Sequence, residues 1–380
     1  MSPVSQIDLL APLLEDAPDI SALANQQVWS TIRQHAGSYG VAALIAYAVR
    51  PHVTGEDRQW CDRILTESWV RHERMLGCLE NLLRLFDANG IPVIALKGPL
   101  LARRYYKPAF LRKPSMDLDL AVSAQYLDRA CKVLASEGYA PSKPIRDALS
   151  DSHHVELDKP SQPRLELHFR LSHRALGIAV DELFERAVSV SLPNGRKALV
   201  LGAADQLLHL ILHLTQSRFG TLFHLFEVRR VCRAETSDVL AEAISRGVRH
   251  HYCGALRMMD IAFRTRWKEP FLVPGTNIPK TWLNSRLTPE LFRAFESWSL
   301  PGRDLHLADR IYGRWLDFQL TDRPRDALRS AAYFLATAKS SVGQSRAWGS
   351  VKRLRFAHDS PISHTEVESR RHPASTGMNS

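Results

Sequence analysis

Cysteines are few in this chain, and their spacing indicates neither a zinc ribbon nor a disulfide framework. Five occur in 380 residues, and no two form a Cys-x-x-Cys pair. This argues against a zinc ribbon and against a small fold held together by disulfides. Unpaired cysteines suit a reducing compartment, so we expect a cytoplasmic protein.

Long apolar runs are also missing. The N-terminus carries acidic residues within its apolar stretch and lacks the positively charged start of a signal peptide. No later segment has the length of apolar sequence that a membrane-spanning helix requires. We therefore expect a soluble protein without a membrane span.

Acidic residues are outnumbered by basic ones, which gives a formal net charge of +10. A surplus of this kind favours polyanionic partners such as a nucleotide, a nucleic acid or an acidic lipid surface. The basic residues are scattered in short clusters, however, and solvated helix faces account for most of them. Nucleic acid is therefore a partner that we consider but do not favour.

Helical periodicity marks both ends of the chain. Residues 28–49 and 64–90 return an apolar side chain every three or four positions, and helices resume at Asp205 and continue to about Ala338. Residues 358–380 are polar and poor in apolar side chains, which predicts a disordered tail. We predict an N-terminal helical region over residues 1–87 and a C-terminal one over residues 201–357.

The intervening residues 88–200 have a different rhythm. The runs "IPVIALKG" at 91–98 and "SMDLDLAV" at 115–122 predict buried strands, each followed by a helix. Residues 153–158 and 164–171 flank the turn-rich "KPSQP" and predict a β-hairpin. The predicted fold class is α+β, with a small mixed sheet flanked by the two helical regions.

Two aspartates stand one residue apart inside the second predicted strand. Side chains at i and i+2 of a strand share a face, so Asp117 and Asp119 stand side by side. Adjacent carboxylates repel each other, and a fold tolerates them when a metal ion lies between them or when water solvates them. A solvated edge strand therefore remains an alternative to a metal site.

A third carboxylate lies on the predicted hairpin. In its second strand Glu166 and His168 share one face, while the leucines alternate onto the other. An amphipathic strand with solvated charges would show the same pattern. If this strand neighbours the first aspartate strand, Glu166 joins Asp117 and Asp119, and three carboxylates suit two Mg²⁺ ions that clamp a phosphate.

A phosphate cradle is predicted where the first strand meets its helix. Gly98 lets the backbone approach a ligand closely, and the helix start presents N–H groups and a positive dipole end. Lys97 adds a point charge, and Arg112 adds a planar fork for phosphate oxygens. A tight turn and a surface arginine are the ordinary alternatives.

Three histidines are candidates for an acceptor site. His168 shares the face of Glu166 and is suited to orienting an acceptor, to acid–base chemistry or to a structural hydrogen bond. His209 and His213 follow Asp205 at helical spacing and form a polar stripe on an apolar helix. Two histidines make an incomplete zinc site, so helix packing or an acceptor-pocket wall is favoured over zinc.

In their order along the chain, these motifs resemble the nucleotidyltransferase superfamily with the polymerase-β-like fold. Within it, the chain resembles the bacterial "uncharacterised nucleotidyltransferase" family. The motifs are "LKG", then a helix, an Arg ahead of "DLDL", "LELHF" and the helix "LLHLILHL". The resemblance covers roughly residues 25–235.

The resemblance implies magnesium-dependent transfer of a nucleoside monophosphate from an NTP, such as ATP, to an acceptor, with release of pyrophosphate. It implies that Asp117 and Asp119 hold two Mg²⁺ ions, or Mn²⁺, and that Glu166 completes one metal shell. Gly98 and the following helix start would contact the phosphates. The acceptor would be a small molecule, a peptide or a protein.

One departure from the family pattern opens an alternative. The superfamily's usual turn is Gly-Ser, whereas this chain has Lys97, Gly98 and Pro99, and proline has no N–H to offer a phosphate. A catalytically degenerate fold that serves as a nucleotide- or RNA-binding regulatory module is therefore the second hypothesis.

Overall fold

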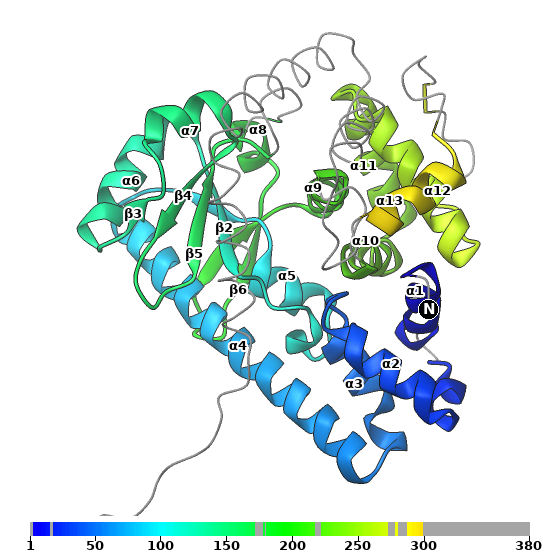
Figure 1. Cartoon of the computed structure of the whole chain (residues 1–380). Coiled ribbons are helices and arrows are strands. Elements are labelled where there is room, and N and C mark those ends of the chain that lie inside the picture. The colour runs from blue at the N-terminus through cyan, green and yellow to red at the C-terminus, as the bar shows by residue number, and fades with distance from the viewer. Residues whose placement is uncertain are drawn as a thin grey trace, which may run out of the picture. The chain divides into compact units, whose positions relative to one another are not determined.

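The computed structural model describes residues 3–15, 18–171, 178, 180–216, 222–272, 278–279 and 287–298 (Figure 1). All of them belong to one compact unit, Met1–Ser330. The helices predicted for residues 299–338 and the tail predicted for residues 358–380 lie outside the described residues. The predicted boundaries of the three regions therefore stay a prediction.

Helices form the N-terminal part of the chain, as its periodicity predicts. They are α1 Pro3–Leu10, α2 Gln26–Ala36, α3 Ala42–Val49 and the long α4 Gly55–Ala88, with 3-10 turns η1 Ala11–Leu14, η2 Ile20–Ala24 and η3 Arg50–His52. The carboxamide oxygen of Asn25 caps α2 by accepting from two backbone N–H groups. Gly40, at φ +74°, separates α2 from α3, and Gly90, at φ +61°, follows the end of α4.

A seven-stranded mixed sheet lies at the centre of the described residues, in the order β3-β4-β5-β2-β1-β7-β6. The strands are β1 Val93–Ala95, β2 Asp117–Val122, β3 Ala140–Pro141, β4 His154–Asp158, β5 Arg164–His168, β6 Val188–Ser191 and β7 Lys197–Val200. β2 pairs antiparallel with β1 and parallel with β5, while β4 and β5 form the predicted hairpin. The α+β prediction is confirmed.

Short elements connect these strands. They are α5 Gly98–Tyr105, η4 Ala109–Leu111, η5 Ala124–Tyr126, α6 Leu127–Ser136, α7 Ile145–Asp151 and α8 Val180–Phe184. No strand is predicted after residue 171, yet β7 pairs parallel with β1 and β6 pairs antiparallel with β7. These two strands have only four residues each, and β3, which was also not predicted, has two, too few to show a clear alternation.

One face of the sheet is apolar throughout. Leu118, Leu120, Leu165 and Leu167 point to this face and pack in one hydrophobic core. The second half of α4 and helix α6 contribute the other side of that core, and Figure 1 shows α4 running past the strands. Because alternate residues point to opposite faces, burying these leucines turns Asp117, Asp119 and Glu166 to the other side.

The opposite face is divided between apolar and polar residues. Ile94 of β1 and Leu199 of β7 pack there against a second core, which the N-terminal helices share with the helices after the sheet. Those helices are α9 Ala203–Gln216, α10 Leu222–Ala234, α11 Ser237–Arg249, α12 Cys253–Trp267 and α13 Pro289–Trp298. The strands β2, β5 and β4 present charged residues and histidines to the same side.

Two findings bear on the absences noted in the sequence. Within the described ranges, no helix combines the length and the apolar character needed to cross a bilayer. All five cysteines lie in these ranges and are free thiols. No pair of these cysteines is joined by a disulfide bond in the described ranges.

We predict that Leu120→Ala lowers the free energy of unfolding by about 2–5 kcal/mol, because the side chain is fully buried between the sheet and its covering helices. Met116, four residues earlier and 82% exposed, provides the control. Met116→Ala should change the free energy by less than about 0.5 kcal/mol. Chemical denaturation of both variants measures the difference, and equal effects would contradict the burial of Leu120 in this core.

Candidate active site

The strand register places acidic residues in one row across three strands. Glu166 of β5 is the Cα partner of Asp119 in β2 on one side and of Glu156 in β4 on the other. Directly opposed side chains in neighbouring strands lie roughly 5 Å apart, where like charges destabilise a sheet. Arg164 offsets the outermost acid, since its guanidinium lies 3.0 Å from Glu156. The register thus brings together two of the three predicted carboxylates.

Asp119 is buried and is held by Lys97 and His168. Its Oδ1 atom lies 3.4 Å from Lys97 Nζ and 3.1 Å from His168 Nε2. Burial raises the pKa of Asp119, but the charge of Lys97 and the hydrogen bond from His168 outweigh burial and hold the pKa well below its usual value. Asp119 is therefore ionised, and its negative charge lies in a site from which water is largely excluded.

Asp117 lies two residues before Asp119 on the same face of β2, and both side chains line one cavity. Burial and the negative charges of Asp119 and Glu166 raise the pKa of Asp117 to about 6. Its carboxylate belongs to neither of the compact groups of metal-binding atoms found among the described residues. One of these groups consists of Asp119, Glu166 and His168, whose donor atoms lie within 4.8 Å of one another.

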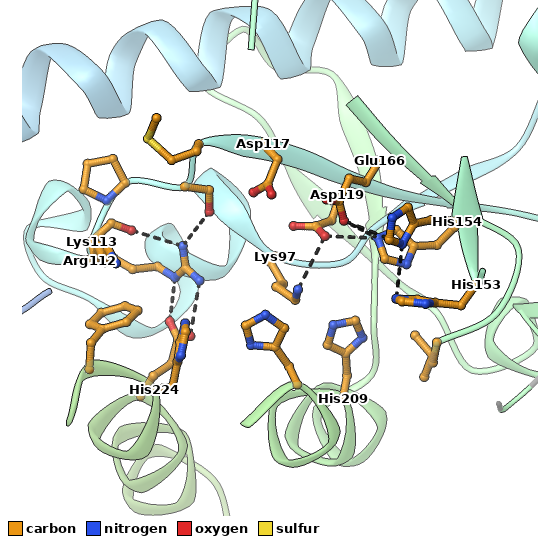
Figure 2. A pocket seen from close by; sticks show the side chains of 18 residues that line it. Lys97, Arg112, Lys113, Asp117, Asp119, His153, His154, Glu166, His209 and His224 are labelled. Atoms are coloured by element: carbon orange, nitrogen blue, oxygen red, sulfur yellow. Dashed lines mark hydrogen bonds and ion pairs between the residues drawn. The ribbon is translucent and has the colours of Figure 1, made fainter. Parts of the chain in front are cut away.

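The turn after β1 directs Lys97 toward these acids (Figure 2). The backbone N–H of Leu96 donates to the carbonyl of Asp119 at 3.1 Å, which fixes the end of β1 beside β2. Gly98 then adopts φ +68°, a value that side chains disfavour, and begins α5. Pro99 lies in the first turn of that helix and supplies no N–H.

Arg112 is buried in the wall of the cavity and forms a two-pronged ion pair with Glu227 of α10. Its Nε and Nη2 atoms lie 2.5 and 3.2 Å from the two carboxylate oxygens of Glu227. Its Nη1 atom has longer bonds, at 3.3 Å to Ser115 and 3.4 Å to Lys113. Most of the fork predicted to bind phosphate is thus already occupied by a carboxylate.

Histidines of α9 and α10 form the wall that faces the carboxylates, and Figure 2 shows His209 and His224 projecting from these helices. Burial, with Lys97 nearby, holds the pKa of His209 well below its usual value. The charge of Lys97 and burial do the same to the pKa of His213. Asp205, on the same predicted stripe, instead binds Arg186 and Arg246.

All nine residues that the sequence singled out, except Gly98, line one cavity of about 350 Å³. This volume is within the range of small-molecule sites. Six further lining residues with polar or charged side chains were not predicted: Lys113, Ser115, His153, His154, His224 and Glu227. His153 and His154 had a usable signal, because the hairpin register predicts that a histidine of its first strand faces His168.

A mixed sheet with paired acids beside a strand–glycine–helix turn is typical of nucleotidyltransferases. Comparison with protein families agrees, since the model of an uncharacterised nucleotidyltransferase family matches residues 21–264. This is more than half of the chain, which therefore belongs to that family and is a nucleotidyltransferase. No curated protein matches the chain.

Two solved structures are similar to part of the chain. The antibiotic-resistance factor ANT(2'')-Ia, in solution, is 9% identical with a TM-score of 0.35, over 46% of this chain and 92% of its own. The lincosamide antibiotic adenylyltransferase LnuA, in a lincomycin-bound crystal structure, is 15% identical with a TM-score of 0.32, over 42% of this chain and 97% of its own. The family match carries the assignment.

We predict that the Arg112–Glu227 pair is strongly coupled. Glu227→Met leaves a buried guanidinium without its counterion and should cost about 3–5 kcal/mol of folding free energy. The double variant Arg112→Met/Glu227→Met should lose clearly less than the sum of the single variants, which a double-mutant cycle measures. The exposed Asp128–Lys132 pair of α6 is the control and should show a much smaller coupling, because water screens it. Additive effects at Arg112 and Glu227 would contradict the pairing.

Proposed function

We propose that the protein transfers a nucleoside monophosphate from an NTP to an acceptor by a two-metal mechanism. The observation that supports it is the register of Asp119 beside Glu166, with Asp117 on the same face of the cavity. In the reaction an acceptor oxygen, or a related nucleophile, forms a bond to the α-phosphorus. The bond from that phosphorus to the bridging oxygen breaks, and pyrophosphate leaves.

The donor set fits Mg²⁺, which prefers oxygen ligands and keeps waters and phosphates in its shell. Asp117, Asp119 and Glu166 would hold two such ions, and the cavity lies on their side of the sheet. When bound, the ions activate the attacking oxygen and neutralise charge on the pyrophosphate. Glu166, only partly buried, accepts the proton that the acceptor loses. Mn²⁺ fits the same ligands.

The phosphates would lie between the carboxylates and the start of α5. Lys97 supplies a positive charge there. Gly98 has a positive φ, and apart from its chain neighbours and its own helix backbone no described atom lies within 4 Å of the place that a Cβ atom would take. A phosphate can therefore approach the backbone closely at this point. Arg112 contributes through Nη1, because Glu227 holds the other side of the fork. We assign these three residues to the nucleotide.

The acceptor would occupy the side of the cavity lined by α9. His168, His209 and His213 line it, and His209 Nδ1 is buried without a hydrogen-bond partner among the described residues. A buried nitrogen of this kind costs free energy until a ligand satisfies it. The acceptor is a small molecule, a peptide or a protein whose reacting group hydrogen-bonds to this wall.

We predict that Asp119→Asn lowers the rate of pyrophosphate release by at least about 100-fold. The change keeps the size of the side chain but removes a metal-binding charge, and tenfold in rate corresponds to about 1.4 kcal/mol of transition-state stabilisation. The assay uses the purified protein, Mg²⁺, each NTP in turn and a panel of hydroxyl-bearing acceptors.

The matched control is Asp128→Asn, which changes an exposed aspartate of α6. It should retain the rate of the unchanged protein. Absence of Asp119-dependent pyrophosphate release with every NTP and acceptor class would argue against catalysis. It would leave the second hypothesis, a nucleotide- or RNA-binding module, which Pro99 in the first turn of α5 favours.

We predict that Mg²⁺ with a bound NTP raises the melting temperature of the protein. A ligand present at 100 times its Kd stabilises the native state by about 2.7 kcal/mol. The variant Asp117→Ala/Asp119→Ala should stay folded and lose this shift, as differential scanning fluorimetry and circular dichroism can show. An RNA-binding module would instead show RNA affinity that falls steeply with salt and persists in the double variant.

A further inference from the structure

Histidines gather at the β4 edge of the cavity, beside the carboxylates. One ring nitrogen each from His153, His154 and His168 lies within 4.8 Å of the others. His154 of β4 and His168 of β5 are Cα partners in the hairpin, so their side chains share a face, and His153 directly precedes β4. Figure 2 shows the rings of His153 and His154 at the end of the row formed by Asp119 and Glu166.

The spacing of these nitrogens suits a tetrahedral metal ion. His154 Nδ1 lies 3.2 Å from His153 Nε2. Ligands at 2.0–2.1 Å from a tetrahedral Zn²⁺ ion lie about 3.3 Å apart, so these two atoms already have the separation of two zinc ligands. Glu166 Oε2, 3.8 Å from His154 Nδ1, is placed to supply a fourth ligand.

His168 has the partners of a metal-binding histidine. Its Nε2 atom lies 3.1 Å from Asp119 and 3.4 Å from Glu166. Its Nδ1 atom is buried and has no hydrogen-bond partner in the part of the chain that the structure describes. Carboxylates that hold one ring nitrogen commonly orient the other toward a metal, and a buried nitrogen without a partner is costly otherwise.

We propose that His153, His154 and His168, with Glu166, bind Zn²⁺ next to the carboxylates assigned to Mg²⁺. Imidazole nitrogens favour a borderline ion of this kind over Mg²⁺, which prefers oxygen. Three histidines and one further ligand form a complete tetrahedral set. This site shares Glu166 with the carboxylates that we assign to Mg²⁺, but its three histidines need no bound nucleotide to come together. Its role is to fix the ring of His168, which lies against Asp119.

Zinc titration of the full chain tests the proposal. After chelator treatment, the protein is titrated with Zn²⁺ in excess Mg²⁺, and bound zinc is measured by elemental analysis and by competition with a chromophoric chelator. We expect one Zn²⁺ per chain. His153→Asn and His154→Asn should each weaken zinc binding by at least about 100-fold, since loss of an orienting partner alone costs 10–100-fold.

Two control variants separate this site from its surroundings. His52→Asn changes an exposed histidine of η3 and should leave zinc affinity unchanged. Asp117→Asn should also retain zinc, because Asp117 belongs to neither compact donor group. If Asp117→Asn abolishes nucleotide-dependent stabilisation but keeps zinc, then zinc binding does not depend on the nucleotide, although both sites use Glu166. Zinc binding without any nucleotidyl transfer would count against the proposed function only.

A measurement on the unchanged protein guards against variants that misfold. Co²⁺ replaces Zn²⁺ and, in a tetrahedral site with nitrogen ligands, gives intense visible absorption bands. We expect these bands to appear with one equivalent of Co²⁺ and to vanish when Zn²⁺ is added. Stoichiometric zinc binding that survives His153→Asn and His154→Asn, or an octahedral Co²⁺ spectrum, would overturn the proposal.

Discussion

The repulsion between carboxylates aligned in one row of the sheet is the constraint on which the rest of the site depends. Asp119, Glu166 and Glu156 lie side by side on three strands. Arg164 offsets the outer member, and Lys97 offsets the inner one. Burial, together with the remaining negative charge of Asp119 and Glu166, raises the pKa of the neighbouring Asp117 to about 6. A cation would stabilise such a row, which agrees with the metal-dependent chemistry that we propose.

The charge of Lys97 offsets that of Asp119 only because the backbone fixes the position of Lys97. The hydrogen bond from Leu96 to the carbonyl of Asp119 aligns the end of β1 with β2. The positive φ of Gly98 then turns the chain into α5 immediately, so the ammonium stays beside the acid instead of following the strand outward. The turn that we propose to contact a phosphate thus also stabilises the ionised Asp119. A bound phosphate would share that ammonium.

The sequence predicted the parts of the site that follow from local alternation. Leucines between the acids determine which face each carboxylate takes, and the turn between residues 158 and 164 determines the hairpin. It did not predict that Glu227 holds Arg112, because the two are 115 positions apart and only tertiary packing of α10 joins them. The four-residue strands β6 and β7 were missed for a related reason, since β7 is defined by its pairing with β1 and β6 by its pairing with β7 rather than by their own sequence patterns.

The wall opposite the carboxylates shows how charge is distributed across the cavity. Burial, with the charges of Lys113 and Lys97 adding to it, lowers the pKa of His224 to about 3, and the pKa values of His209 and His213 are lowered well below the usual histidine value. These imidazoles are therefore neutral at physiological pH. Arginines at the same positions would form ion pairs with the carboxylates and would take the place of a metal cation. The neutral rings, which we propose to hydrogen-bond to the acceptor, form no ion pair with the carboxylates. The row of carboxylates therefore still requires a cation.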